Sequence, residues 1–213
     1  MGQRIILWRH GQTDWNLENR FQGHSDIPLN NEGLAQARRA APILKSLRPD
    51  KIISSDLIRT QQTAQTLADL CHLPVHLDAG LRETHGGKWE GKTGAQNREE
   101  DYDRFVNWLD GGDERAGETG ERRSEIADRA VNAIESALDN SINVLIVVTH
   151  GGAARCVLGK MLGMPMHQWS AIGGLSNACW SIIENGHHRD GWILVEHNAG
   201  SLPEPIYGEE SGA

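Results

Sequence analysis

The sequence predicts an α/β protein with a mostly parallel central sheet and helices on both faces, built as a single domain over residues 1–213. Short apolar runs rich in β-branched residues alternate along the chain with longer stretches whose apolar residues recur at helical spacing. The most hydrophobic run, residues 144–148, shows no polar alternation, which is typical of a strand buried on both faces of a sheet. A chain of 213 residues can also bury a sizeable core.

Strands and helices alternate from the first residues onward. Residues 5–8 are a short, half β-branched apolar run and predict the first strand. Helical spacing over residues 30–47 predicts a helix that Pro49 ends. Residues 51–54 predict the second strand, and the Ser-Asp pair at 55–56 supplies an N-cap for the helix that follows.

The middle of the chain changes character. An extended piece over residues 74–77 leads on to Glu83. From about residue 86 to 120 the chain is polar, with Gly-Gly pairs and an acidic run at 99–103. We interpret 86–120 as an excursion that contains one helix and covers the site as a lid. The helical pattern returns over residues 123–138.

The last part of the chain completes the sheet. A helix over residues 153–162 is predicted after the central strand at 144–148. Residues 179–183 and 192–195 flank a polar turn and predict an antiparallel pair that closes the sheet. The tail, about 199–213, is rich in Gly, Pro and Glu and is expected to fray.

Composition argues against several classes of partner. The formal net charge of −8 argues against nucleic acid and against an anionic membrane. No apolar run approaches the ~20 residues that span a bilayer, and the N-terminus lacks the features of a secretory signal, so we expect a cytoplasmic protein. The cysteines show no disulfide or metal spacing and are expected to be reduced core thiols: Cys71, Cys156 and Cys179.

Three predicted strands each deliver a cationic or titratable side chain at or just after the carboxyl end. Arg9 and His10 follow the first strand, Arg59 follows the second, and His150 follows the central one. In open α/β sheets the ligand crevice lies outside those carboxyl ends, so the four residues are expected to converge. Taken singly, each histidine could be a cap or core residue and each arginine a solvated one.

These residue types suit phosphoryl transfer. Such a reaction spreads negative charge over the phosphoryl oxygens, and catalysis is mostly positioning and electrostatic stabilisation. Arg9 and Arg59 can hold those oxygens in charge-assisted pairs, and the amides of Gly151 and Gly152, which open a helix, can also donate. Nearby positive charge should keep His10 neutral, so that it can attack phosphorus.

Departure of an alkoxide requires a proton. Glu83 is the candidate donor, because a carboxyl group that is partly desolvated and near a bound phosphate dianion holds its proton more firmly. It could then activate the hydrolytic water. The alternative interpretation is a surface ion pair between Arg82 and Glu83.

Several short motifs occur in one order along nearly the whole chain. They are Arg-His-Gly-x-Thr-x-Trp-Asn at 9–16, Phe-Gln-Gly at 21–23, Ser-Ser-Asp at 54–56 with Arg59, Glu83 before Gly-x-Trp-Glu-Gly at 87–91, and Thr-His-Gly-Gly at 149–152. In these residues the chain resembles the histidine phosphatase superfamily, which includes the cofactor-dependent phosphoglycerate mutases. The resemblance implies a phosphoglycerate mutase-like fold.

The resemblance also implies roles for individual residues. His10 would be the phospho-acceptor and Glu83 the proton donor. Further residues would form or contact the phosphate pocket: Arg9, Arg59, His150, Asn16, Gln22, Gly23 and Gly151. One position departs from the family pattern, since Arg122 stands where the family has a serine after Gly-Glu.

The other histidines carry less information. His85 is close enough to Glu83 to touch the substrate, whereas His187 and His188 lie in a polar turn and are expected to be solvated. No histidines share a ligand spacing or an accompanying carboxylate cluster, so the sequence predicts neither a metal site nor a cofactor.

Three functions are compatible with such a site: a phosphatase, a mutase and a non-catalytic sensor of a phosphorylated ligand. The resembling mutases exclude water with a longer cap and a basic tail. Here the tail is short and acidic, and residues 97–120 carry eight acidic side chains against three basic ones, which favours hydrolysis. A sensor would lack the nucleophile or the acid, and both are present.

Short segments at 81–85, 175–180 and 197–199 also resemble glucosyl-3-phosphoglycerate phosphatases. We therefore expect a metal-independent phosphatase that acts through a phosphohistidine on a small phosphorylated metabolite, such as glucosyl-3-phosphoglycerate or a related sugar or glycerate phosphate. The sequence leaves the formation of a homodimer open.

Overall fold

The computed structural model of the protein describes residues 2–185 and 191–200. Its described strands form one sheet in the order β3-β2-β4-β1-β5-β6. They are β1 (Arg4–Arg9), β2 (Lys51–Ser54), β3 (Val75–Leu77), β4 (Val144–Thr149), β5 (Trp180–Asn185) and β6 (Trp192–Ala199). β1 to β4 pair in parallel, and β5 and β6 add an antiparallel edge, which confirms the predicted sheet.

The described helices alternate with the strands as predicted. The α-helices are α1 (Asp14–Leu17), α2 (Asn31–Ser46), α3 (Ile58–Cys71), α4 (Gly94–Glu100), α5 (Tyr102–Leu109), α6 (Arg123–Ala137) and α7 (Gly151–Met161). Short 3₁₀ turns are η1 (Ala79–Leu81), η2 (Gly87–Trp89) and η3 (Met166–Ala171). None of the helices in the described residues is long and apolar enough to cross a membrane.

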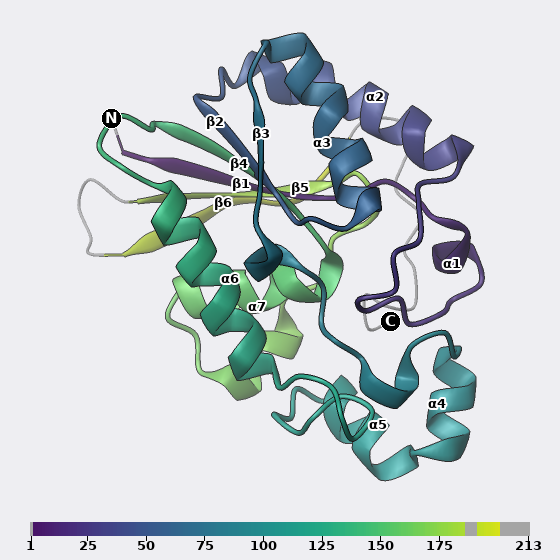
Figure 1. Cartoon of the computed structure of the whole chain (residues 1–213). Helices are drawn as coiled ribbons and strands as arrows, with labels where there is room; N and C mark the ends of the chain where they lie inside the picture. Colours follow the sequence, from purple (N-terminus) through teal and green to yellow (C-terminus); the bar gives the residue numbers. More distant parts are fainter. Residues whose placement is uncertain (1, 186–190, 201–213) are drawn as a thin grey trace.

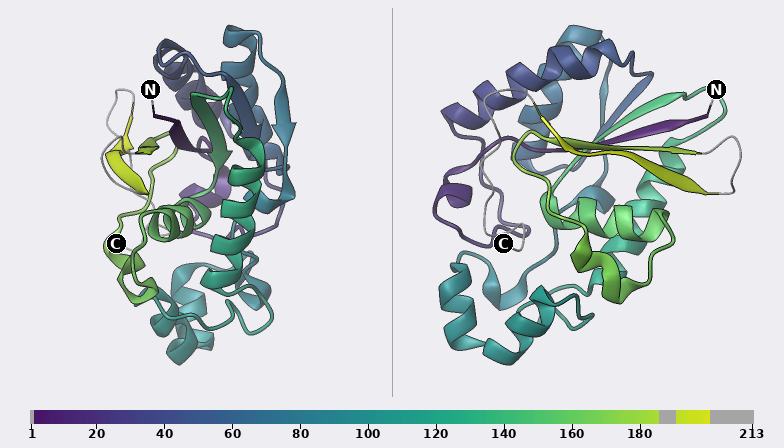
Figure 2. Two further views of the ribbon diagram at one scale, coloured as in Figure 1. Left: turned by 90° about the vertical axis from the view of Figure 1, so that its left-hand side faces the viewer. Right: turned by 180° about the vertical axis from the view of Figure 1, so that it is seen from behind.

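Helices cover both faces of the sheet (Figures 1 and 2). Successive side chains of β1 point to opposite faces. Ile6 and Trp8 join an apolar cluster with α2 and α3, whereas Ile5 and Leu7 join another with α6 and α7. β4 contributes to both clusters in the same way, and this two-sided burial explains its continuous apolar run.

The start of α3 differs from the prediction. The N–H of Ile58, its first residue, donates to Asp26 Oδ1 at 2.7 Å, so the cap comes from a loop remote in sequence. Asp56 instead forms an ion pair with Arg82 at 2.6 Å. The Ser55 hydroxyl lies in the functional site described below. The predicted N-cap at Ser55 and Asp56 was therefore wrong, because both side chains bind other residues: Ser55 binds His150 and Asp56 binds Arg82.

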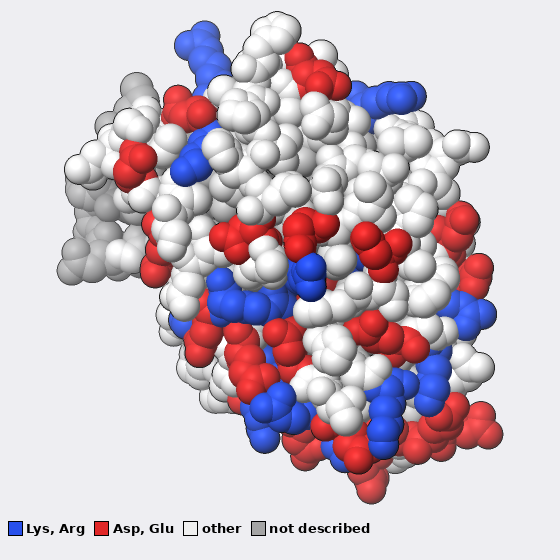
Figure 3. Space-filling view, in the orientation of Figure 1, with Lys and Arg blue, Asp and Glu red and all other residues white. Residues whose placement is uncertain are grey.

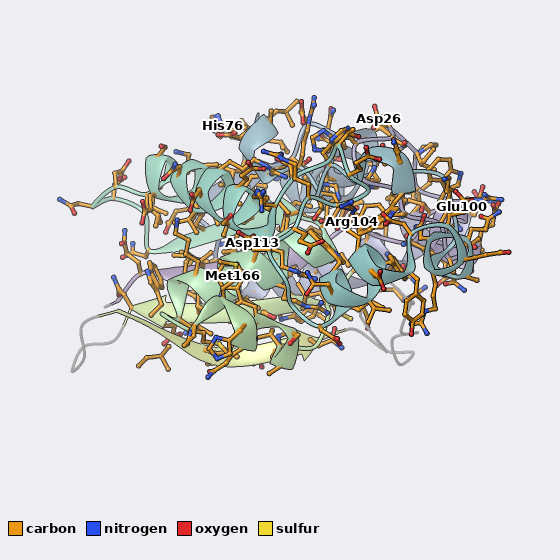
Figure 4. The ribbon with its side chains drawn as sticks, turned by 90° about the horizontal axis from the view of Figure 1, so that it is seen from below. Asp26, His76, Glu100, Arg104, Asp113 and Met166 are labelled. Carbon is orange, nitrogen blue, oxygen red and sulfur yellow. The ribbon has the colours of Figure 1, made fainter. Side chains whose placement is uncertain are left out.

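The lid, residues 86–120, contains two α-helices where one was predicted. Asp101 separates them, with a φ of −146° and a ψ of 52°, a non-helical backbone that ends α4 before α5 begins. Its carboxylate accepts a hydrogen bond from the indole of Trp89 at 3.1 Å, which holds this corner against the lid core. Figure 3 shows both signs of charge mixed over this part of the molecule, and Figure 4 shows the lid helices from below, with Glu100 and Arg104 labelled.

A third apolar cluster joins the lid to the main body. Trp89 packs edge-on against Phe105 and Trp108, with ring centroids 5.2 and 5.8 Å apart. Ile126 of α6 and Cys156 of α7 belong to the same cluster. The lid is thus seated on α6 and α7, beside the carboxyl end of the sheet.

Some predictions concern thiols, boundaries or undescribed residues. Cys156 and Cys179 are buried free thiols whose pKa burial raises to about 11, while Cys71 is only half-buried. β6 continues to Ala199, into the stretch predicted as tail. The turn that carries the paired histidines and the acidic tail from residue 201 lie outside the described residues.

Candidate active site

The parallel register of β1 and β4 brings two histidines together. Arg9 pairs with Thr149 across the two strands, so the next residue of each strand, His10 and His150, lies at the same edge of the sheet. Their ring centroids are 5.2 Å apart. His10 is 2 % exposed and His150 is fully buried, as is Arg59. The predicted convergence of these residues is confirmed.

Hydrogen bonding defines which nitrogen of His10 is available. Nδ1 lies 2.7 Å from the carbonyl oxygen of Gly11. Because that carbonyl can only accept, Nδ1 carries the proton and Nε2 keeps its lone pair. The local backbone therefore presents Nε2 as the nucleophilic atom.

The second histidine is held as a neutral hydrogen-bond relay. Arg59 Nε donates to His150 Nδ1 at 3.2 Å, so the ring proton must sit on Nε2. That nitrogen lies 3.0 Å from the hydroxyl of Ser55, which accepts from it. Arg59 also donates to the carbonyls of Gly23 and Ser25, each at 2.8 Å. One guanidinium therefore connects a site histidine to the 23–25 loop.

Burial lowers the pKa of both histidines well below their usual value. Removal of water is the largest cause for each ring, and the charge of Arg59 is the second. Arg9 lowers the pKa of His10 further. Both rings are therefore neutral at neutral pH, as the sequence predicted for His10.

This burial predicts that stability falls in mild acid. Below pH 6.5, the ordinary histidine pKa, an unfolded chain binds protons that the folded site does not accept. The free energy of unfolding should then fall with a slope that is about half of 1.4 kcal/mol per pH unit for each such histidine at pH 6.5 and approaches about 1.4 at lower pH, until the folded pKa is reached. Urea unfolding at several pH values between 7 and 5.5 measures the slope. His150→Asn should reduce it by the share of one histidine, and an unchanged slope would refute this assignment.

Two amide side chains were predicted to contact the phosphate, those of Asn16 and Gln22. Gln22 is 1 % exposed; its Oε1 accepts from Thr13, and its Nε2 has no partner among the described residues. Asn16 uses its Oδ1 to accept from Thr13 and Asn177. In both residues the amide oxygen is thus occupied, which leaves an NH₂ group to donate.

Gly23 and Gly151 shape the backbone of the site. Gly23 has a φ of +50°, and a Cβ there would lie 2.1 Å from Glu90 Oε1, so only glycine fits. Gly151 is the first residue of α7, and a Cβ there would lie 3.5 Å from the Arg9 guanidinium. Arg9 itself is 1 % exposed and donates to the carbonyl of Leu175 at 2.6 Å.

The carboxylate of Glu83 is held by backbone amides at the start of α7. It accepts from the N–H groups of Thr84, Gly152 and Ala153 at 2.8, 3.0 and 2.9 Å. The Gly152 amide, which the sequence assigned to phosphate, therefore binds Glu83 instead. The surface ion pair was also a wrong alternative, because Arg82 pairs with Asp56 and Glu83 is only 7 % exposed.

Sequence reasoning missed the residue that fixes the Glu83 segment. Arg129 of α6 donates to the carbonyls of Gly80, Arg82 and Glu83 at 2.7 to 2.8 Å. It also pairs with both carboxylate oxygens of Glu121. Its only sequence signal is a half-buried position on an amphipathic helix, which does not distinguish it from a solvated arginine.

Two further predicted positions lie at the edge of the site. His85 has a side chain 42 % exposed, stacks near His24 with ring centroids 5.1 Å apart, and lies 3.9 Å from Glu90. Arg122 donates to the carbonyl of Asp113 at 2.6 Å and is the N-cap residue of α6. The departure from the family serine thus anchors a helix end to the lid.

Comparisons with known proteins match most of the chain. The family model of the histidine phosphatase superfamily (branch 1) matches residues 5–200. A glucosyl-3-phosphoglycerate phosphatase of Mycolicibacterium vanbaalenii is 34 % identical over 198 residues, 89 % of this chain and 87 % of that protein. A probable phosphoglycerate mutase of Yersinia pestis is 36 % identical over 198 residues, 90 % of each chain.

A solved structure of a related protein has a similar fold. A mycobacterial glucosyl-3-phosphoglycerate phosphatase in complex with VO₃ superimposes with a TM-score of 0.85 at 34 % identity. The match covers 93 % of this chain and 100 % of that one.

Proposed function

The chain belongs to the histidine phosphatase superfamily, and its relatives include phosphatases at 34 % identity. We propose that it hydrolyses a phosphate monoester of a glycosylated glycerate through a phosphohistidine at His10. The observation that carries the chemistry is the pair of adjacent, neutral, buried histidines at the carboxyl end of the sheet, with Arg59 hydrogen-bonded to His150. The names of the relatives support the substrate class.

In the first step, His10 Nε2 attacks phosphorus while the ester P–O bond breaks. Arg9, Arg59 and the NH₂ group of Gln22 stabilise the charge on the phosphoryl oxygens. His150, which is also neutral, lies beside His10 and adds a polar side chain to the phosphate pocket. Since both rings are uncharged at neutral pH, the nucleophile needs no prior deprotonation.

Glu83 moves protons in both steps. In the first step protonated Glu83 gives its proton to the leaving alkoxide oxygen. The resulting carboxylate, oriented by three backbone donors, then accepts a proton from the water that attacks the phosphohistidine. Breaking the N–P bond releases inorganic phosphate and restores His10.

A mutase is the second candidate, supported by the mutase-named relative. The lid argues against it. Among residues 97–120, acidic side chains outnumber basic ones by eight to three, and this balance disfavours retention of a bisphosphorylated intermediate. A sensor without catalysis is disfavoured by the intact nucleophile and proton donor.

Release of inorganic phosphate tests the proposal. Wild-type protein is incubated with glucosyl-3-phosphoglycerate, 3-phosphoglycerate and p-nitrophenyl phosphate, without added metal or bisphosphoglycerate. Release, fastest from the glucosyl ester, is the expected result. Isomerisation of phosphoglycerate that starts only when bisphosphoglycerate is added would identify a mutase instead, and no turnover in either assay would favour a sensor.

Cytoplasmic location and assembly as a homodimer stay predictions. Independence from a metal or cofactor also stays one, and the same assay with and without a chelator tests it.

A further inference from the structure

A cavity of about 570 Å³ lies between the lid and the start of α7. Glu83, Thr84 and Gly152 form its wall toward the catalytic site. Its other sides come from the N-terminal loop, the lid, α6 and α7, and they include Phe21, Asn97, Phe105, Leu109, Arg123 and Arg155. The cavity therefore reaches the proton donor, and its lining does not include the two histidines.

Its position identifies which part of a substrate it faces. The atom that Glu83 protonates is the ester oxygen, which joins phosphorus to the leaving group. With the phosphoryl group held at His10 and Arg59, the leaving group must extend past Glu83. The cavity that Glu83 lines lies on that side.

Two buried arginines make this cavity cationic. Arg123 of α6 is 3 % exposed and Arg155 of α7 is 9 % exposed. Arg123 stacks over the ring of Trp108, 4.2 Å from its centroid, and donates to the Trp108 carbonyl. Its Nε has no partner among the described residues, and the carboxylates of Asp113 and Glu83 act on its charge without forming a described salt bridge to it. A buried cation with an unpaired N–H and no close counter-ion is costly, which favours an anionic ligand.

The two cations also act on each other. Burial lowers the pKa of both guanidinium groups, and the charge of Arg123 lowers the pKa of Arg155 further. A bound anion would reduce this repulsion between like charges. Planar guanidinium groups match a carboxylate in paired hydrogen bonds.

An unsatisfied amide provides a second, independent indication. Asn97 of α4 is 1 % exposed and lines the cavity, yet neither its Oδ1 nor its Nδ2 has a partner among the described residues. A buried amide left unpaired costs free energy, so it is expected to bind a ligand that both donates and accepts. A hydroxyl group of a sugar does both.

From these contacts we propose that the cavity is the leaving-group subsite, in which Arg123 and Arg155 bind a carboxylate and Asn97 binds a sugar hydroxyl. The substrate class is then a phosphate ester whose alcohol carries its own carboxylate and a hexosyl group. This rests on the proposed hydrolase function and adds the residues that select the substrate.

The size of the cavity fits this class better than a bare glycerate. A volume of about 570 Å³ lies within the range of pockets that enclose drug-sized ligands. A glycerate alone would leave most of it filled with water. Phe21, Phe105 and Leu109 supply an apolar wall on which the carbon face of a sugar ring can pack.

The test compares two esters that differ only in the carboxylate: 3-phosphoglycerate and glycerol 3-phosphate. Wild type should prefer the first. Arg123→Met should lower kcat/KM for 3-phosphoglycerate by about 30-fold or more, because the buried carboxylate of the substrate loses its cationic partner. The same variant should change kcat/KM for glycerol 3-phosphate by less than about 3-fold. Arg123→Lys, which keeps the charge, should recover part of the loss. Asn97→Ala should lower kcat/KM for glucosyl-3-phosphoglycerate more than it lowers kcat/KM for 3-phosphoglycerate.

A matched control lies on the same lid. Arg104→Met removes an arginine that hydrogen-bonds to Asp101 and does not line the cavity. This variant should leave kcat/KM unchanged for both esters. Thermal unfolding checks that each variant is folded. Calorimetric binding of glycerate and of glycerol to wild type and Arg123→Met provides a readout that does not need turnover.

These assays distinguish failure of the subsite proposal from failure of the proposed hydrolase function. Equal loss on both esters in a folded Arg123→Met protein, or no preference of wild type for the carboxylate in turnover and in binding, overturns the subsite. Absence of phosphate release from every ester by wild type overturns the hydrolase function, while the glycerate titration still decides the subsite.

Discussion

Replacing His10 with alanine is expected to lower phosphate release by about 10³-fold or more, because the reaction loses the atom that forms the covalent intermediate. The arginines and Gln22 would still bind the phosphoryl group. The affinity for inorganic phosphate should therefore change far less than the rate. Steady-state release of phosphate from the best ester, together with phosphate binding, measures both quantities.

The same variant tests the intermediate directly. Wild-type protein quenched in alkali during turnover of a ³²P-labelled ester should carry an alkali-stable, acid-labile label, as a phosphohistidine does, and His10→Ala should carry none. His76→Ala, at an exposed position of β3, serves as the matched control and should keep both label and rate. Undiminished turnover by a folded His10→Ala protein would rule out the proposed nucleophile.

Replacing Glu83 with glutamine is expected to produce the second-largest loss. The change keeps the size of the side chain and one oxygen for the backbone donors of α7 but removes the titratable proton. General acid–base catalysis of this kind contributes about 10² to 10⁴-fold, so kcat for an alkyl ester should fall by that factor.

The loss should depend on the leaving group. A nitrophenolate departs without a proton, so p-nitrophenyl phosphate should lose much less in the phosphorylation step than a glycerate ester does. Burst kinetics separates this step from hydrolysis of the intermediate. Glu184→Gln, in an ion pair with Arg4 at the far end of the sheet, is the control. Equal losses for both leaving groups in the burst phase would show that Glu83 is not the general acid.

The elements of the sheet were predictable because their signals are local. The apolar runs at 5–8, 51–54 and 144–148 became β1, β2 and β4 with boundaries shifted by at most one residue. A strand buried on both faces must be apolar throughout, so its composition alone identifies it. The order of strands in the sheet then placed His10 and His150 at one edge.

The errors concern contacts between segments remote in sequence. The cap of α3 comes from Asp26, and the amides of α7 bind Glu83 rather than phosphate. In the lid, the acidic run breaks at Asp101, whose carboxylate accepts from the Trp89 indole. Each local pattern offered several donors and acceptors, and only tertiary packing selects among them.

The sequence by itself determined the fold class and the family, and it predicted the residues that converge at the candidate site. Periodicity and motif order are properties of neighbouring residues, and parallel strands bring their carboxyl ends to one edge. Tertiary structure alone decided the tautomers of His10 and His150, the anchoring of Glu83 by Arg129, and the cavity at Arg123. These features depend on hydrogen bonds and burial between distant segments, and such contacts exist only once the chain has packed.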